Sequence, residues 1–104
     1  MTHEIRHGLT VEQASRAAHL ALDEYLARYA SRGLTGSWSG DTRAEIAFAA
    51  KGMHVTATVE ILADVLRVEA NVPFVLRVFK TQAISAVERE AHKWIDQVKA
   101  EAGA

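Results

Sequence analysis

The side chains best suited to chemistry at neutral pH are five histidines, because imidazole can bind a metal or transfer a proton. They are His3, His7, His19, His54 and His92. His3 and His7 are four residues apart, a spacing that would place both on one face of a helix. A metal site needs three or four converging ligands, and only Glu4 lies nearby in sequence. We therefore expect an ordinary polar N-terminus, with no metal and no cofactor.

Serine, aspartate and histidine also provide the residue types of a hydrolytic triad. The candidates are Ser37, Ser39, Asp41 and Asp64, with His54 as the base. Many serine hydrolases carry the nucleophile in a G-x-S-x-G turn, and no such motif occurs in this chain. Asp41 in the GDT triplet is more typical of a turn before a strand. His54 and His92 fall at positions expected to be exposed. The sequence therefore predicts no catalytic residue, and we expect a protein that is not an enzyme.

Two long helices are predicted to position whatever site exists. In residues 10–32 the apolar side chains recur at helical spacing and form one stripe: Val11, Ala14, Ala18, Leu22, Tyr25 and Tyr29. Thr10 and Gln13 match a capping box at the start of this helix, and Gly33 follows its last turn. Residues 81–101 return to the same spacing, with a stripe made of Ile84, Val87, Ala91, Trp94, Ile95 and Val98.

Between the helices, residues 43–71 have a hydrophobic period of two, which is typical of half-buried strands. Tight turns are predicted at residues 51–52 and 63–64. The resulting register pairs Phe48 with Val55, Ile46 with Ala57, Ile61 with Leu66, and Val59 with Val68. It also places Arg43, Glu60 and Arg67 side by side on the outer face, as a cross-strand row of charges.

The order of these elements predicts the fold. Residues 3–7 are a candidate leading strand, and residues 31–42, SRGLTGSWSGDT, have the composition of the main loop. The order is therefore (β)-α-β-β-β-α, with an antiparallel sheet of three to four strands. Packing both long helices on one face of the sheet would bury all three apolar surfaces. We expect a two-layer α+β structure that forms a single domain over residues 1–104.

Composition excludes several classes of partner. The chain has 12 Lys and Arg, 13 Asp and Glu, and no cysteine. The order α-β-β-β-α also occurs in double-stranded-RNA-binding domains, but residues 80–101 carry four cations and four anions, so this helix lacks the charge that phosphates require. We expect no nucleic-acid partner. No apolar run is long enough for a transmembrane segment, and no secretory signal is visible at the N-terminus, so we expect a cytoplasmic protein.

Two apolar segments are candidate partner contacts. Residues 71–80, NVPFVLRVFK, contain Phe74, Leu76 and Phe79. Pro73 suits the first turn of a helix, with Val75, Phe79 and Val78 continuing the apolar stripe, although the segment could also be a loop. It either closes one end of the core or exposes a patch to a partner. Trp38 in the Ser-Gly-rich loop either covers the sheet edge or stays available.

The outer face of the sheet is a further candidate surface. Small or apolar side chains are expected there at Ala47, Ala49, Thr56, Thr58 and Val65. The face is either solvated or the contact of a homodimer.

Several short motifs together resemble a known family. They are His7-Gly8-Leu9 before a helix, Ala14 in VEQA, SWSGD at residues 37–41, the hairpin around Gly52, and Val72-Pro73 before Phe79. With these motifs, residues 3–98 resemble the polyhydroxyalkanoic acid system proteins, which bacteria encode near genes for polyhydroxyalkanoate synthesis. The resemblance implies a cytosolic protein linked to storage-polyester granules. It implies no known reaction and no catalytic residues.

Two functional hypotheses follow. The first is a non-enzymatic accessory protein that acts by apolar contact with a granule, a granule protein or its own copy. Trp38, Phe74, Leu76 and Phe79 are its candidate contact residues. The alternative is a small-molecule-binding protein or enzyme with a site between the helices and the sheet. A cavity of roughly 300 Å³ or more would favour the alternative, especially one lined by Tyr25, Tyr29, Trp94 and a histidine, and a solid core would exclude it.

Overall fold

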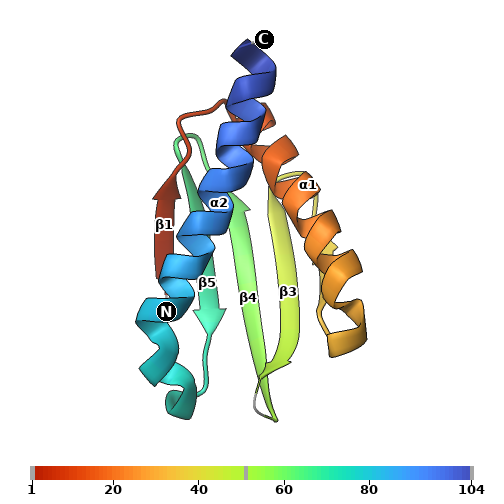
Figure 1. The fold of residues 1–104 in the computed structure, drawn as a ribbon, viewed down its shortest axis with the longest axis vertical. Coiled ribbons are helices and arrows are strands. Elements are labelled where there is room, and N and C mark those ends of the chain that lie inside the picture. Colours follow the sequence, from red (N-terminus) through yellow and green to blue (C-terminus); the bar gives the residue numbers. More distant parts are fainter. Residues whose placement is uncertain (1, 51, 104) are drawn as a thin grey trace.

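The computed structural model describes the backbone of residues 2–50 and 52–103, and the side chains of the same residues except 50, 74–76, 102 and 103. Figure 1 shows the elements in chain order. They are β1 (Thr2–Arg6), α1 (Val11–Tyr29), a 3₁₀ turn (Ala30–Arg32), β2 (Thr35–Trp38), β3 (Arg43–Ala50), β4 (Met53–Ile61), β5 (Val65–Asn71), a 3₁₀ helix (Phe74–Phe79) and α2 (Lys80–Gly103).

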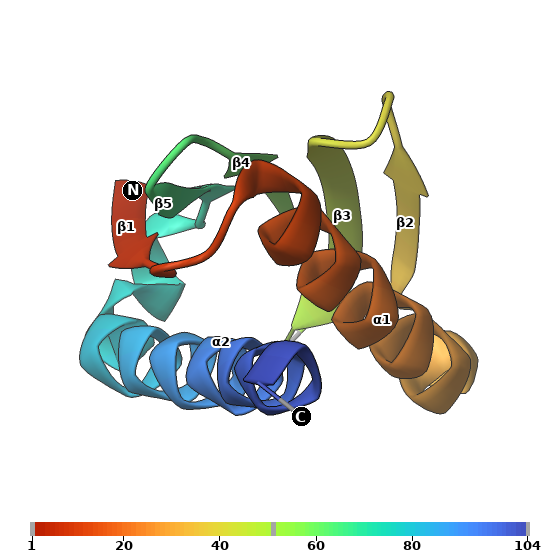
Figure 2. The ribbon, with the colours of Figure 1, turned by 90° about the horizontal axis from the view of Figure 1, so that it is seen from above.

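The five strands form one antiparallel sheet in the order β1-β5-β4-β3-β2. Both long helices pack on the same face of this sheet (Figure 2). The predicted α+β class, two-layer architecture and element order are confirmed, including the leading strand β1. The expected number of three to four strands is one too low, because residues 35–38 form the edge strand β2 rather than part of a loop.

Strand β2 was missed because Thr35, Gly36 and Ser37 lack the large apolar side chains that mark a strand. Gly36 lies opposite Ile46 in the register, on the side of the sheet that faces the helices. A Cβ atom on Gly36 would lie 3.2 Å from Leu26 Cδ2 of α1 and 3.3 Å from the Glu45 carbonyl oxygen. The glycine therefore allows α1 to pack closely on this edge of the sheet.

The predicted capping box at the start of α1 and the left-handed Gly33 that stops the chain from continuing as a helix are confirmed. The Thr10 side chain accepts a hydrogen bond from the Gln13 backbone N–H, and the Gln13 side chain accepts one from the Thr10 backbone N–H, both at 3.1 Å. Gly33 adopts a left-handed conformation with φ of 88°, which glycine allows without steric cost. The last three residues of the predicted 10–32 helix form the 3₁₀ turn instead.

The predicted registers of the central strands are also confirmed. Phe48 pairs with Val55 and Ile46 with Ala57, while Ile61 pairs with Leu66 and Val59 with Val68. The row of outer-face charges forms as predicted, with Arg43 Nη1 at 3.7 Å from Glu60 Oε1. Strand β1 lengthens this row, because Arg67 Nε lies 3.0 Å from Glu4 Oε2. Exposed pairs of this kind contribute less than about 1 kcal/mol each.

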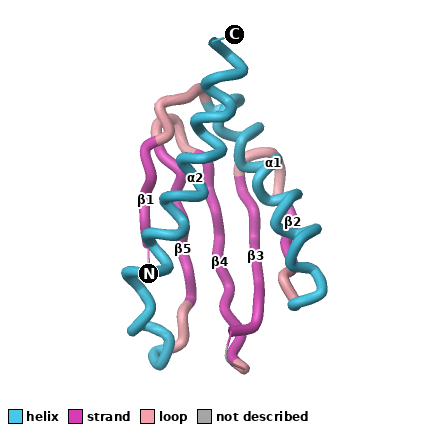
Figure 3. Tube along the Cα trace, viewed as in Figure 1, coloured by secondary structure: helices cyan, strands magenta, loops and turns pink. Residues whose placement is uncertain are grey.

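The core lies between the sheet and the two helices. Its buried apolar members are Ile5, Ala14, Ala17, Leu22, Ala44, Val55, Ile61, Leu66, Ile95 and Val98. Figures 1 and 3 show that the helices are close together near the C-terminal end of α2 and diverge toward the β3–β4 hairpin. In keeping with this, Phe48 near the end of β3 is 36% exposed and Val87 of α2 is 39% exposed. The apolar face of the sheet is therefore incompletely covered at this end.

Within residues 71–80, Asn71 ends β5 and residues 74–79 form the 3₁₀ helix that leads into α2, so the part after Pro73 is helical rather than a loop. The prediction that Val78 continues the apolar stripe is wrong, because Val78 is 78% exposed. Phe79 is 42% exposed. The side chains of Phe74, Val75 and Leu76 lie outside the described part of the structure.

Candidate functional site

The candidate triad residues do not converge. His54 lies at the start of β4, whereas Asp64 lies in the turn beyond the other end of this strand. Because a strand rises about 3.3 Å per residue, the two side chains are separated by roughly 20 Å or more. Ser37 lies on the edge strand β2, with β3 between it and β4. This geometry offers no nucleophile beside a base.

His3 and His7 do not form a metal site. They lie on and just after a strand, not a helix, so four residues separate their positions by about 13 Å. His3 Nε2 lies 3.0 Å from Glu88 Oε1 of α2. Within residues 2–50 and 52–103, no group of three or more His, Cys, Asp or Glu is placed to hold a metal ion.

The expectation of an ordinary polar N-terminus is wrong for His7. This side chain is 1% exposed. Its Nδ1 accepts a hydrogen bond from the Leu9 N–H at 3.0 Å, and its Nε2 lies 2.9 Å from the Leu62 carbonyl oxygen. Since Nδ1 accepts, Nε2 carries the proton and donates it to that carbonyl. His7 therefore joins the β1–α1 connection to the β4–β5 turn, which is a structural role.

Trp38 lies half-buried at the end of β2, opposite Ala44, on the face of the sheet that carries the helices. Its ring stacks on His19 of α1 with centroids 3.5 Å apart and an interplanar angle of 10°. His19 Nε2 in turn lies 3.1 Å from the Asp41 carbonyl oxygen. Trp38 therefore packs against α1 at the edge of the sheet, while Phe79 lies at the other side of the molecule, where the 3₁₀ helix joins α2.

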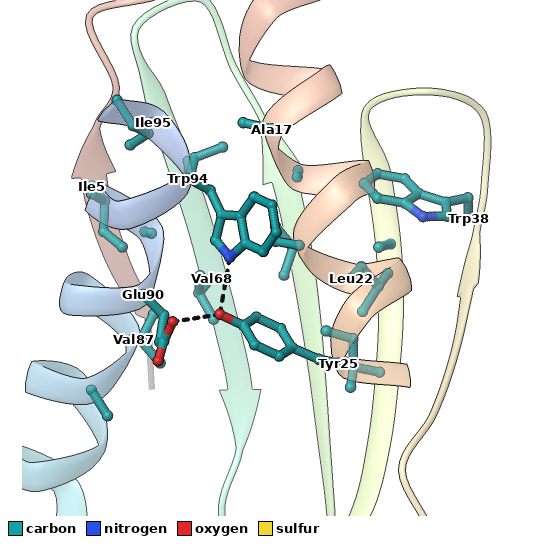
Figure 4. Close-up of a pocket in the computed structure, with 18 residues that line it drawn as sticks. Ile5, Ala17, Leu22, Tyr25, Trp38, Val68, Val87, Glu90, Trp94 and Ile95 are labelled. Carbon is teal, nitrogen blue, oxygen red and sulfur yellow. Dashed lines mark hydrogen bonds between the residues drawn. The ribbon is translucent and has the colours of Figure 1, made fainter. Parts of the chain in front are cut away.

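A cavity of about 330 Å³ lies between the two helices and the sheet. Side chains from α1, α2, β1, β2, β3, β4 and β5 line it (Figure 4). The lining is apolar apart from the polar ends of Tyr25, Trp38 and Trp94 and the carboxylate of Glu90. Alanines make up much of the helical part of the lining: Ala17, Ala18 and Ala21 on α1, and Ala86 and Ala91 on α2. The cavity exists because these small side chains do not fill the space between the layers.

Three polar groups meet between the helices at this cavity. The Tyr25 hydroxyl donates a hydrogen bond to Glu90 Oε2 at 2.5 Å and accepts one from Trp94 Nε1 at 3.0 Å. Figure 4 shows Tyr25 reaching from α1 toward both residues on α2. We call Tyr25, Glu90 and Trp94 the polar bridge. Burial and the bond to Glu90 raise the pKa of Tyr25 above 10.0. The same bond lowers the pKa of Glu90 below 4.5.

The polar bridge was only partly anticipated. The expected cavity residues Tyr25 and Trp94 do line it, but Tyr29 and the histidines are absent from the described lining. Glu90 was missed. Its sequence signal is a carboxylate one turn before Trp94, directly beside the apolar stripe of α2. The arrangement is a mainly apolar cavity with hydrogen-bond acceptors at one end, and it places no nucleophile against a base.

One comparison with known proteins identifies the chain. The family model described as "putative polyhydroxyalkanoic acid system protein" matches residues 2–95. The chain belongs to this family. The resemblance to this family that the sequence motifs indicate is thereby confirmed, over residues 3–95 of the expected 3–98. No curated protein and no solved structure matches it. Within the described residues of the chain, neither long helix is long and apolar enough to cross a membrane.

Proposed function

We propose that this protein is a non-enzymatic, cytoplasmic accessory protein of the polyhydroxyalkanoate system that contacts the storage-polyester granule. Family membership supports a role in this system. The observation that carries the proposal is the apolar opening between the diverging helices, a 330 Å³ cavity with an almost wholly apolar lining. A polyester with aliphatic side chains presents the same kind of surface, so contact would remove apolar area from water on both sides.

Exposed apolar side chains at residues 78 and 79 extend this contact to the end of the 3₁₀ helix. Val78 is the most exposed large apolar side chain of the described part, and Phe79 and Val87 are also exposed. With a net charge of -1, the chain has little electrostatic attraction to an anionic surface. We therefore assign the granule contact to Val78 and Phe79, add Phe74 and Leu76 as candidates from the sequence alone, and place Trp38 at the edge of the same helix-bearing face.

A co-sedimentation experiment with isolated granules tests this assignment. Each apolar side chain removed from the contact costs about 1 kcal/mol, so the double variant Val78→Ser/Phe79→Ser should lower the partition coefficient for granules about thirtyfold. The matched control is Val11→Ser, an exposed valine at the first residue of α1. It should partition as the wild type does.

Other results would contradict granule contact or indicate a different partner. Wild-type protein that stays in the supernatant, or a double variant that sediments as well as wild type, would contradict granule contact through residues 74–79. Sizing chromatography of the same variants identifies the alternative partner, its own copy. In that case the wild type would elute as a dimer and the double variant as a monomer.

A second candidate function is supported by the cavity itself. Its volume of about 330 Å³ falls at the lower end of the range that small-molecule sites occupy, roughly 300–1,000 Å³. A solid core would have excluded this function, and the core is not solid. The protein would then bind a small apolar molecule inside the fold, separately from any granule contact through residues 74–79.

A further inference from the structure

We propose that the cavity binds one uncharged aliphatic chain, an alcohol or an ester, and discriminates against the carboxylate form of the same chain. This inference rests on the second candidate function, the binding of a small apolar molecule between the helices and the sheet. It adds the chemical class of the ligand and assigns the discrimination to Glu90.

The size of the cavity limits the ligand to a single chain. An apolar cavity of about 150 Å³ holds one benzene ring. The cavity between the helices is roughly twice as large at about 330 Å³. It therefore has room for about twelve non-hydrogen atoms, which is the size of a medium-length aliphatic alcohol or its methyl ester.

The charge of the lining selects against an anion. Glu90 is the one charged residue among the described lining side chains. The hydrogen bond from Tyr25 lowers the pKa of Glu90, which keeps the carboxylate ionised at neutral pH. A second carboxylate brought to the same end of the cavity would meet this charge in a partly apolar setting, where repulsion exceeds its value in water.

The nearby cations do not cancel this effect inside the cavity. Arg28 Nη2 lies 3.0 Å from Glu24 Oε1, so its charge is paired. Lys93 Nζ lies 5.4 Å from the centroid of the Trp94 ring. Neither Arg28 nor Lys93 lines the cavity. Lys93, Arg89 and Arg28 all lower the pKa of Glu90 through their charges, but Arg89 too is outside the lining. For a ligand head group beside Glu90, the carboxylate is therefore a closer charge than any of these three cations.

At its own end of the cavity, the polar bridge also sets the hydrogen bonds that a ligand can make. The Tyr25 hydroxyl already donates its proton to Glu90 and accepts one from Trp94. The Trp94 N–H is likewise used. Carboxylate oxygens can accept several hydrogen bonds, so Glu90 retains acceptor capacity while the donors of the bridge are occupied. An alcohol, which brings its own O–H donor, fits this end better than an ester, and an ester fits better than a carboxylate.

Displacement of a neutral fluorescent dye, Nile red, from the full-length protein tests the inference. Decanol, methyl decanoate and decanoate serve as competitors of equal chain length, at neutral pH and below their aggregation concentrations. We expect decanol and methyl decanoate to displace the dye at concentrations about tenfold lower than decanoate requires, because only decanoate is repelled by the charge of Glu90. Glu90→Gln should remove most of this difference by improving the binding of decanoate.

The matched control is Glu69→Gln, which removes the same charge from the outward-facing side of β5. It should leave the ratio between decanol and decanoate unchanged. A measurement on wild-type protein does not depend on the folding of any variant. Decylammonium carries the opposite charge on the same chain, so it should displace the dye at least as well as decanol.

The possible results distinguish a failure of the binding site from a failure of the proposed discrimination. If the dye and all four chains fail to bind, the cavity is not a binding site and the second candidate function fails. If the chains bind but decanoate competes as well as decanol, or decylammonium competes less well than decanoate, the site binds apolar chains without the proposed discrimination. An unchanged ratio in Glu90→Gln would overturn the assignment to Glu90.

Discussion

At the scale of single residues, His7 shows how a side chain suited to chemistry serves the fold instead. Its two ring nitrogens bind the Leu9 N–H and the Leu62 carbonyl, and the ring is almost completely buried. Gly8 follows it with φ of 61°, a conformation that residues with a Cβ rarely adopt. Together they turn the chain from β1 into α1. The sequence could not reveal this role, because Leu62 lies 55 residues away along the chain.

Substitution of His7 measures this role. His7→Ala leaves the Leu9 N–H and the Leu62 carbonyl without their partner and creates a cavity. We expect the free energy of unfolding to fall by about 2–4 kcal/mol. Urea denaturation followed by circular dichroism gives the value. The control is His54→Ala, at an exposed position of β4, which should change stability by less than about 0.5 kcal/mol. Equal effects of the two substitutions would contradict a structural role for His7.

At the scale of elements, the hydrogen bond between Tyr25 and Glu90 joins α1 to α2 where the helices have begun to diverge. The direction of each pKa shift gives the pH range in which the bond stabilises the fold. Glu90 has a lowered pKa in the folded state, so its contribution is present above 4.5 and is lost as the pH falls through the folded pKa. Tyr25 has a raised pKa, so its contribution is present below 10.0 and is lost as the pH rises through the folded pKa.

The pH dependence of stability tests this link between the helices. We expect Tyr25→Phe to lower the free energy of unfolding between these two pH values, because the variant lacks the hydroxyl. The difference from wild type should shrink at the acid end, as Glu90 becomes protonated, and again at the alkaline end. Tyr29→Phe, on the same helix but outside the polar bridge, should follow the wild-type pH profile. A pH-independent difference for Tyr25→Phe would show that packing of the ring, rather than the bond to Glu90, joins the helices.

The elements themselves differ in how far the sequence predicts them. The helices and the strands β3, β4 and β5 have clear hydrophobic periods, and the capping box and tight turns define their ends, so their registers were predicted correctly. Strand β2 has no such period. Its pairing with β3 depends on backbone hydrogen bonds and on the absence of a side chain at Gly36. The sequence therefore predicts a strand of this kind only weakly.

At the scale of the whole molecule, the two-layer fold could be predicted but the cavity could not. Periodicity shows which positions face the core, and these positions were largely correct. Whether facing side chains fill the space depends on their volumes and on the separation of the layers. The relevant signal was the number of alanines on the inner sides of both helices, with Ala17, Ala18 and Ala21 on α1 and Ala86 and Ala91 on α2. Alanine favours a helix but contributes little volume to a core.

Filling the cavity should therefore raise the stability of the fold while it weakens ligand binding. Ala18→Leu adds three carbon atoms at a half-buried position of the lining. If the space is open in solution, we expect the free energy of unfolding to rise by about 1 kcal/mol, because new apolar surface is buried without displacing neighbours. The same substitution should weaken dye binding about tenfold or more by occupying the site. A natural core that gains stability when filled is under-packed, which a binding function explains.

Ala49→Leu on the outer face of β3 is the matched control, because it adds the same atoms at an exposed position. It should change neither stability by more than about 0.5 kcal/mol nor dye binding. The decisive result is the sign of the effect of Ala18→Leu. Destabilisation of about 1–3 kcal/mol is typical of a substitution that overpacks a filled core. It would mean that α1 and α2 close over the sheet in solution, and the cavity would then be unavailable to any ligand.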